Sequence, residues 1–179
     1  AIDEIRRRDL QLSAHETALL LERCTGRAAD SPLLERVQLF TEGWPVGVRL
    51  AALALRRGDD ADDPGFDGGS PQVWQYFVEE VMTGQSALAR ACLLRTSILE
   101  RFSAPLCQAL LGEAATAECF DGHSFFGFVA HGGLLCFPVD ESGEWYCYHR
   151  LFREFLQRQL AVHHSAEEIA ALHRRAAAW

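Results

Sequence analysis

Apolar side chains recur every three or four positions along most of the chain, which is the spacing of an amphipathic helix. Over the first third, this pattern predicts three short helices at about residues 13–26, 31–43 and 45–58. The first begins at a capping box from Ser13 to Glu16, and the second has Ser31 as its N-cap with Pro32 behind it. The apolar side of the third helix comprises Val46, Leu50, Leu53 and Ala54. Three such helices predict a compact bundle over residues 1–58.

The helical period disappears after Gly58, where acidic residues, glycine and proline crowd together. This composition is typical of a solvated, flexible connection. An EF-hand loop would need spaced acids and a closing glutamate, which the run lacks. We therefore interpret residues 59–70 as a linker between two domains.

Helical spacing resumes beyond the linker and then changes to strand chemistry. A helix opened by Ser70 and Pro71 is expected to turn Phe77, Val78 and Val81 inward, and shorter helices follow near residues 86–96, 103–111 and 120–131. The pair Gly132-Gly133 ends this pattern. Alternating residues on both sides of a three-residue turn, Glu141-Ser142-Gly143, predict a β-hairpin over about 134–149, and Pro138 predicts that its first strand is an edge strand.

Two more helices follow the hairpin. The first is expected to bury Leu151, Phe152, Phe155, Leu156 and Leu160, and the second starts at a capping box formed by Ser165 and Glu168. Helices followed by a two-stranded wing make a winged-helix domain, here residues 71–162. The predicted fold is therefore mainly α: a small helical bundle followed by a winged-helix domain with one β-hairpin, with residues 163–179 beginning a further helical part.

Composition narrows the possible functions. The chain has no lysine, so all 17 basic residues are arginine, and it can complete neither a P-loop nor a Schiff base by itself. Because no lysine completes a P-loop, we expect the isolated chain not to hydrolyse ATP. Its net charge of −8 repels a polyanion, so we also expect it not to bind duplex DNA tightly. With no signal peptide and no membrane-spanning run, its six cysteines are expected to be reduced thiols in the cytoplasm.

Several residues have the chemistry of a metal or catalytic site. Cys147 and His149, with Cys136 and His131 as further ligands, could form a zinc site, but the spacings of a structural zinc site are missing. The favoured interpretation is therefore that these cysteines pack inside the hairpin. A hydrolase serine motif is also missing. No metal ligand and no catalytic residue is assigned.

Three segments together resemble one family of proteins. They are Leu10-Gln11-Leu12-Ser13-Ala14-His15-Glu16, Thr41-Glu42-Gly43-Trp44-Pro45-Val46-Gly47-Val48-Arg49-Leu50-Ala51-Ala52-Leu53, and Gly143-Glu144-Trp145-Tyr146-Cys147-Tyr148-His149-Arg150-Leu151-Phe152-Arg153-Glu154-Phe155-Leu156. The segments at 93–99 and 172–179 fit the same order. The chain thereby resembles MalT-type bacterial transcription regulators, which are ATP-dependent members of the LuxR family within the STAND class of signalling NTPases.

The resemblance implies a larger protein of which this chain is the middle. Its order would be a P-loop domain, a lid-type helical domain (1–58), the winged helix (71–162), a helical-repeat sensor arm beginning at 163–179, and a LuxR-type DNA-binding domain. The implied partners are the upstream P-loop domain and the downstream sensor arm of the same protein, a small-molecule or protein inducer, and further copies on activation. DNA would be bound only through the C-terminal domain, and no membrane is involved.

The resemblance also implies nucleotide contacts. Gly43-Trp44-Pro45 matches a Gly-x-Pro motif whose proline lies against adenine, and Tyr148-His149-Arg150-Leu151 matches a Met-His-Asp-Leu motif whose histidine contacts the β-phosphate of ADP. Arg150 replaces the aspartate of that motif, and Gln11 stands where the family often has arginine. Two alternatives stay open from the residues alone: Trp44 packs in the core, and His149 caps a helix or braces the hairpin.

These features predict the central helical and winged-helix part of an ATP/ADP-switched, inducer-responsive bacterial transcription activator, with Mg²⁺ bound elsewhere in the parent protein. ADP would hold the resting state, and the parent would be a slow ATPase. The alternative is a freestanding winged-helix module for protein interactions, with no nucleotide role.

Overall fold

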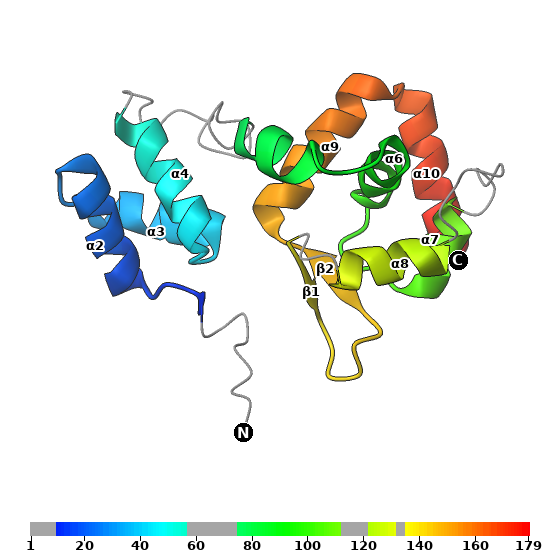
Figure 1. Ribbon diagram of the computed structural model, residues 1–179, viewed down its shortest axis with the longest axis horizontal. Coiled ribbons are helices and arrows are strands. Elements are labelled where there is room, and N and C mark those ends of the chain that lie inside the picture. The colour runs from blue at the N-terminus through cyan, green and yellow to red at the C-terminus, as the bar shows by residue number, and fades with distance from the viewer. Residues whose placement is uncertain (1–9, 57–74, 112–121, 132–134) are drawn as a thin grey trace. The chain divides into compact units, whose positions relative to one another are not determined.

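The computed structural model describes residues 10–56, 75–111, 122–131 and 135–179. It divides into two compact units, residues 1–76 and 77–179. Over the described residues the chain is helical except for one two-stranded antiparallel hairpin (Figure 1). The predicted fold class, a mainly helical chain with one β-hairpin, is confirmed.

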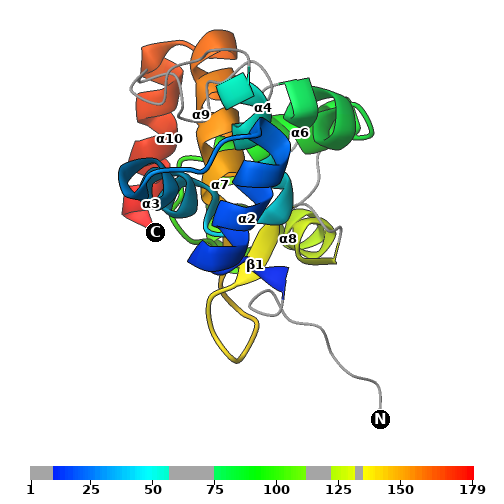
Figure 2. The ribbon, with the colours of Figure 1, turned by 90° about the vertical axis from the view of Figure 1, so that its left-hand side faces the viewer.

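Within residues 14–56 the first unit folds into the helices α2 (Ala14–Thr25), α3 (Ser31–Thr41) and α4 (Pro45–Arg56) (Figure 2). The capping box at the start of α2 is present, because the Ser13 hydroxyl accepts the Glu16 amide while the Glu16 carboxylate accepts the Ser13 amide at 2.8 Å. Gly26 ends this helix in the left-handed region at φ 74°. The buried core of the bundle comprises Leu21, Val37, Val48, Ala51, Ala52 and Ala54.

Two details of this bundle differ from the sequence prediction. The N-cap of α3 is Asp30, not Ser31, because the Asp30 carboxylate accepts the Leu33 amide at 2.9 Å. On α4, Leu53 does not join the buried face: 38% of it is exposed, whereas Ala54 beside it is buried. The small residues of α4 allow close helix packing, so a narrow stripe of side chains is enough to fill the core.

The second unit begins with a short π-helix and continues through helices and the hairpin. Its elements are η2 (Phe77–Met82), α6 (Ala87–Thr96), α7 (Ala104–Leu111), α8 (Gly122–His131), β1 (Cys136–Pro138), β2 (Tyr146–Tyr148), α9 (Arg150–His163) and α10 (Ala166–Ala178). The five residues of α9 expected to face inward are all buried. The core is rich in aromatic rings, with Phe77 within about 5 Å of both Phe152 and Phe155 by ring centroid.

The helix expected after the linker is only partly as predicted. Ser70 and Pro71, its expected start, lie outside the described residues. Phe77 is fully buried, but Val78 is 37% exposed and does not face the core. The π-helical winding of η2 changes which side chains share a face, since the prediction assumed 3.6 residues per turn.

The hairpin itself is confirmed, with Phe137 opposite Cys147 and Pro138 opposite Tyr146. Its connection is longer than the predicted three-residue turn, because residues 139–145 separate the paired strands. On the other side of β2, Phe102 pairs with Tyr146 through two backbone hydrogen bonds of 2.8 and 2.9 Å. Among the described residues β1 pairs with β2 alone, so Pro138 lies on an edge as predicted.

The Asp140 side chain organises the tip of this wing. Its carboxylate accepts hydrogen bonds from the Ser142 hydroxyl at 2.7 Å and from the amides of Glu144 and Trp145 at 3.1 and 3.2 Å. Gly143 supports the turn at φ 67°, a conformation that glycine adopts without strain. Local side-chain bonds of this kind, not the length of the turn, therefore set the shape of the tip.

These bonds predict a pH response of the wing. The Ser142 hydroxyl, followed by the two amides, holds the pKa of Asp140 below its ordinary value. A lowered folded-state pKa contributes stability above the unfolded pKa, and this stability is lost as the pH falls through the folded pKa. We expect the Glu144 and Trp145 amides to stay protected from hydrogen exchange at the pH where an ordinary aspartate protonates, and to lose protection only at more acidic pH. Asp140→Ala should remove the protection at every pH, and equal exchange in both proteins would contradict this role.

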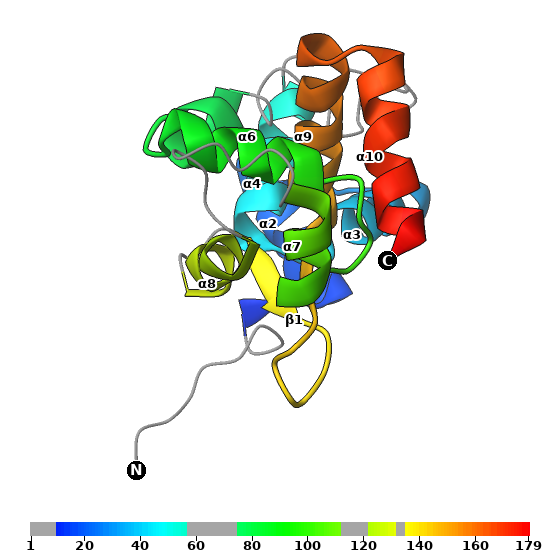
Figure 3. The same ribbon diagram turned by 90° about the vertical axis from the view of Figure 1, so that its right-hand side faces the viewer.

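Helix α10 packs against α7 and α9 within the second unit (Figure 3). The capping box of Ser165 and Glu168 is present at its start, and Leu172 is buried. The sequence prediction assigned residues 163–179 to the beginning of a sensor arm, and that assignment stays a prediction. In this structure the helix lies beside the winged-helix elements.

Candidate functional site

The predicted adenine motif forms the turn between α3 and α4. Glu42 and Gly43 both adopt left-handed backbone conformations, at φ 51° and 70°. The Trp44 amide donates to the Thr41 carbonyl at 2.9 Å, and Pro45 is the first residue of α4. Proline suits this position because the first helical N–H has no partner within the helix. The sequence therefore builds a tight, fixed turn around the motif.

The turn is held against the segment that precedes α2. The Leu12 amide donates to the Gly43 carbonyl at 2.8 Å, and the Gln38 side-chain amide donates to the Leu12 carbonyl at 2.9 Å. Gln38 in turn accepts the hydroxyl of buried Thr17 at 2.6 Å. A β-carbon on Gly43 would collide with the Leu12 carbonyl oxygen, so glycine is needed for this approach.

Gln11 also takes part in this arrangement. Its side-chain amide donates to the Glu42 carbonyl at 3.0 Å, which ties the turn to the start of the bundle. In the sequence, Gln11 is only a departure from the family pattern. Nothing in the local sequence connects it to residue 42, since only the folded chain brings the two together.

Trp44 and Pro45 are both half-buried in the first unit. The Trp44 ring lies edge-on to Tyr76 of the same unit, with ring centroids 6.0 Å apart. The ring therefore does pack against protein, as the alternative interpretation expects, while part of its surface remains accessible. A ligand role for Trp44 and Pro45 stays a prediction.

His149 lies between the wing and α9 and serves as the N-cap of that helix. Its ring Nδ1 accepts the Leu151 amide at 3.3 Å, and its carbonyl accepts the Arg153 amide at 2.9 Å. Its own amide donates to the Leu135 carbonyl at 2.7 Å, which ties the helix start to the beginning of the hairpin. His149 therefore caps the helix and braces the hairpin, as its alternative interpretation expects.

This cap fixes the chemistry of the imidazole. Because Nδ1 accepts a hydrogen bond, a neutral ring carries its proton on Nε2, which is then a donor. A donor at the N-terminus of a 14-residue helix suits a phosphate oxygen. The residue is only 2% exposed, however, and the ring lies beside Phe137 with centroids 6.1 Å apart. The donor therefore fits ADP in kind, but a phosphate could reach it only after the ring or its neighbours move.

Arg150, which replaces an aspartate of the family motif, is engaged on its own helix. Its Nε donates to the Glu154 carboxylate at 2.9 Å. The two side chains are 41% and 25% exposed, so the pair contributes little to stability. The positive charge of Arg150 lies within the first turn of α9, directly after His149 in the sequence.

The cysteines of the second unit do not form a ligand set. The hairpin register places Cys136 opposite Tyr148 and Cys147 opposite Phe137, so the two thiols lie on opposite faces. Burial raises the pKa of Cys107 to about 12 and also raises that of Cys136. Protonated thiols are poor metal ligands. Within the described ranges, no three His, Cys, Asp or Glu side chains are grouped to hold a metal ion, and the side chain of His131 is not among those described.

The predicted site residues thus fall into two groups. Gly43, Trp44 and Pro45 belong to the first unit, and His149 belongs to the second. Each group occupies a sharply defined helix start, which is where backbone N–H groups lack partners within the helix. No described helix is long and apolar enough to cross a membrane.

Comparison with known proteins identifies the second unit. The family described as the MalT winged helix domain matches residues 78–168, which include the hairpin and His149. The chain belongs to the MalT family. It is 34% identical to the HTH-type transcriptional regulator MalT of Serratia proteamaculans over 140 residues, 76% of this chain and 15% of that protein. It is 28% identical to MalT of Yersinia pestis over 178 residues, 97% of this chain and 19% of that protein.

A second kind of relative carries the same segment. This MalT-family chain is 31% identical to the serine/threonine-protein kinase PknK of Mycobacterium tuberculosis over 178 residues, which cover 98% of the chain and 15% of the kinase. The chain therefore spans between about a seventh and a fifth of the length of these relatives. It corresponds to one part of such longer proteins.

Proposed function

We propose that this chain is the central part of a cytoplasmic, ATP/ADP-switched and inducer-responsive transcription activator, a STAND-class member of the LuxR family. The observation that carries the proposal is the MalT winged helix match across the wing and the start of α9, where His149 stands. A second support comes from the turn at Gly43, which is held rigid by Leu12 and Gln11. The upstream P-loop domain of the parent protein would supply the phosphate-binding loop and Mg²⁺.

In this proposal each unit contributes its own nucleotide contact. Pro45, with Trp44 beside it, offers a rigid apolar surface for adenine and no backbone N–H that would compete for the ring. His149 offers its Nε2 proton to the β-phosphate, aided by the positive end of α9. ADP, when bound, supplies the negative charge that these donors neutralise in the resting state. Inducer and ATP would then release the resting state by favouring another arrangement.

The test replaces His149 in the full-length parent protein with asparagine and, separately, with alanine. Asparagine keeps an acceptor for the Leu151 amide and is a good N-cap, but it lacks the imidazole donor. A charge-assisted hydrogen bond contributes roughly 1.5–3 kcal/mol, so both variants should retain ADP about ten- to a hundredfold less tightly and show transcription without inducer. Both variants lose the buried ring, so His149→Ala should lower the melting temperature more than His149→Asn does, because alanine also removes the cap.

His163→Asn is the matched control, since His163 is exposed at the far end of the same helix. It should change neither ADP retention nor inducer dependence. Normal ADP affinity and normal inducer dependence in His149→Asn would mean that His149 acts only as a helix cap.

The kinase relative supports a second candidate, in which the same segment regulates a kinase domain elsewhere in the parent chain. The flanking reading frame separates the candidates. A G-x-x-x-x-G-K-[ST] motif upstream and a LuxR-type domain downstream favour the activator. A protein-kinase domain upstream favours the kinase. If the flanking sequence contains neither arrangement, the freestanding interaction module is favoured.

A further inference from the structure

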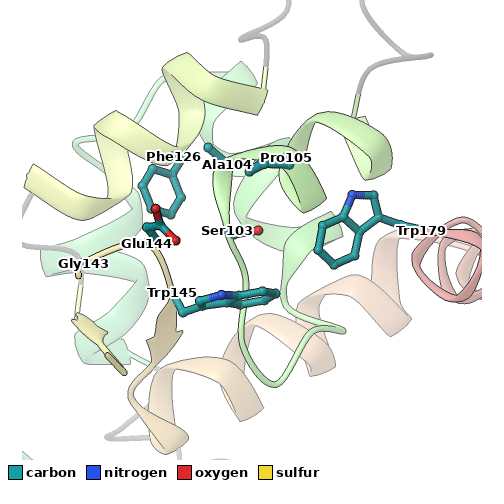
Figure 4. Close-up of a pocket in the computed structure, with 8 residues that line it drawn as sticks. All are labelled: Ser103, Ala104, Pro105, Phe126, Gly143, Glu144, Trp145 and Trp179. Carbon is teal, nitrogen blue, oxygen red and sulfur yellow. The ribbon is translucent and has the colours of Figure 1, made fainter. Parts of the chain in front are cut away.

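A pocket in the second unit is lined by none of the residues proposed as nucleotide contacts. Its volume is about 430 Å³, and it is lined by Ser103, Ala104, Pro105, Phe126, Gly143, Glu144, Trp145 and Trp179 (Figure 4). These residues come from the start of α7, from α8, from the wing and from the end of α10. The size and the aromatic lining are those of small-molecule sites.

Ser103 is the unusual member of this lining. It stands in the N-cap position of α7, because its carbonyl accepts the Cys107 amide at 2.9 Å. An N-cap serine normally uses its hydroxyl to accept an amide of the first turn. Here the residue is 5% exposed, and its Oγ has no hydrogen-bond partner within the described part of the chain. A buried, unpartnered hydroxyl facing a pocket is a group that a ligand would satisfy.

The surroundings of Ser103 favour a carboxylate at this end. The first N–H groups of a helix have no partners within that helix, and they carry its positive end. Pro105 presets the backbone of the first turn without adding a donor. A carboxylate oxygen that accepts the Ser103 hydroxyl would also meet this positive end of α7.

A negatively charged side chain, Glu144, lies on the wing side of the pocket. Figure 4 shows the Glu144 carboxylate on the side of Phe126, apart from the Ser103 hydroxyl. Trp145 and Trp179 form an aromatic corner, with centroids 6.0 Å apart and planes at 68°. The Arg101 guanidinium lies over the Trp145 ring in a cation–π contact, with its Cζ 5.3 Å from the ring centroid. The pocket thus offers a hydroxyl donor, a carboxylate acceptor and aromatic walls.

We propose that this pocket binds a free aromatic α-amino acid. Its carboxylate is placed at Ser103 and the start of α7, its ammonium at Glu144, and its ring against Trp145 and Trp179. A ligand with only a carboxylate would be repelled by the negative charge of Glu144. A ligand with only an ammonium group would be repelled by the positive end of α7. The zwitterion satisfies both ends. The site is independent of the nucleotide proposal, since it shares no residue with it.

The experiment titrates the 179-residue chain with L-phenylalanine, phenethylamine and 3-phenylpropionate, and follows the tryptophan indole N–H signals by NMR. We expect L-phenylalanine to shift the signals of Trp145 and Trp179, and to bind at least tenfold more tightly than either single-charge analogue. Equal binding of the three compounds would overturn the two-ended assignment, and no shift at millimolar concentrations would overturn the site.

Variants locate the contacts. Ser103→Ala and Glu144→Gln should each weaken L-phenylalanine binding about tenfold, whereas Glu141→Gln, at the wing tip but outside the lining, should leave it unchanged. Because none of the described residues partners the Ser103 hydroxyl, Ser103→Ala should melt at the same temperature or higher. A lower melting temperature with unchanged binding would assign Ser103 to helix capping and contradict the proposal.

Discussion

Replacing Phe77 with alanine will lower the free energy of unfolding of the second unit by about 3–5 kcal/mol. Phe77 is fully buried, and its ring centroid lies 5.3 Å from that of Phe152 and 5.2 Å from that of Phe155. The variant therefore loses the burial of one ring and the aromatic contacts of two others. Because a small domain is stable by only about 5–15 kcal/mol, most of its stability is at stake.

Val78→Ala is the matched control for this prediction, since it shortens the neighbouring side chain of the same π-helix. Val78 is 37% exposed, so its loss should change the stability by less than about 0.5 kcal/mol. The free energy of unfolding of both variants is measured by urea unfolding, monitored through hydrogen exchange of the α9 amides. A loss below about 1 kcal/mol for Phe77→Ala would show that Phe152 and Phe155 close over the vacated space.

Gly43→Ala will destabilise the first unit by about 3 kcal/mol, and Gly26→Ala is its control. Both glycines are left-handed, at φ 70° and 74°, so an alanine at either position carries a strain of roughly 1–2 kcal/mol. Around Gly26 a β-carbon would meet nothing within 4 Å, but at Gly43 it would collide with the Leu12 carbonyl oxygen. The difference between the two variants therefore measures the close approach to Leu12 and the loss of its hydrogen bond, which contributes about 1 kcal/mol more.

Thermal unfolding of the two glycine variants is the measurement. In the parent protein Gly43→Ala should also weaken adenine nucleotide binding, because the displaced turn carries Trp44 and Pro45. Gly26→Ala should not, because that glycine ends α2. Equal melting temperatures for the two variants would show that the Leu12 segment yields to the added carbon.

Much of the architecture was readable from the sequence because the signals are local. Helical spacing, the capping boxes at Ser13 and Ser165, and the change to alternating residues after α8 each depend on neighbours within a few positions. The family resemblance was readable for a similar reason, because its motifs are contiguous stretches of chain. Even local signals fail where two residues compete, and both Asp30 and Ser31 are good caps by type.

The sequence by itself determined the helices, the hairpin and the membership of the MalT family. Only the tertiary structure decided which side chains are buried and which polar groups meet: the burial of His149 as a helix cap, the approach of Gly43 to Leu12, and the unpartnered hydroxyl of Ser103 in its pocket. Such features join residues that are distant in the chain, or depend on what packs around one residue. No periodic pattern records them, because they are set by the close packing of whole elements.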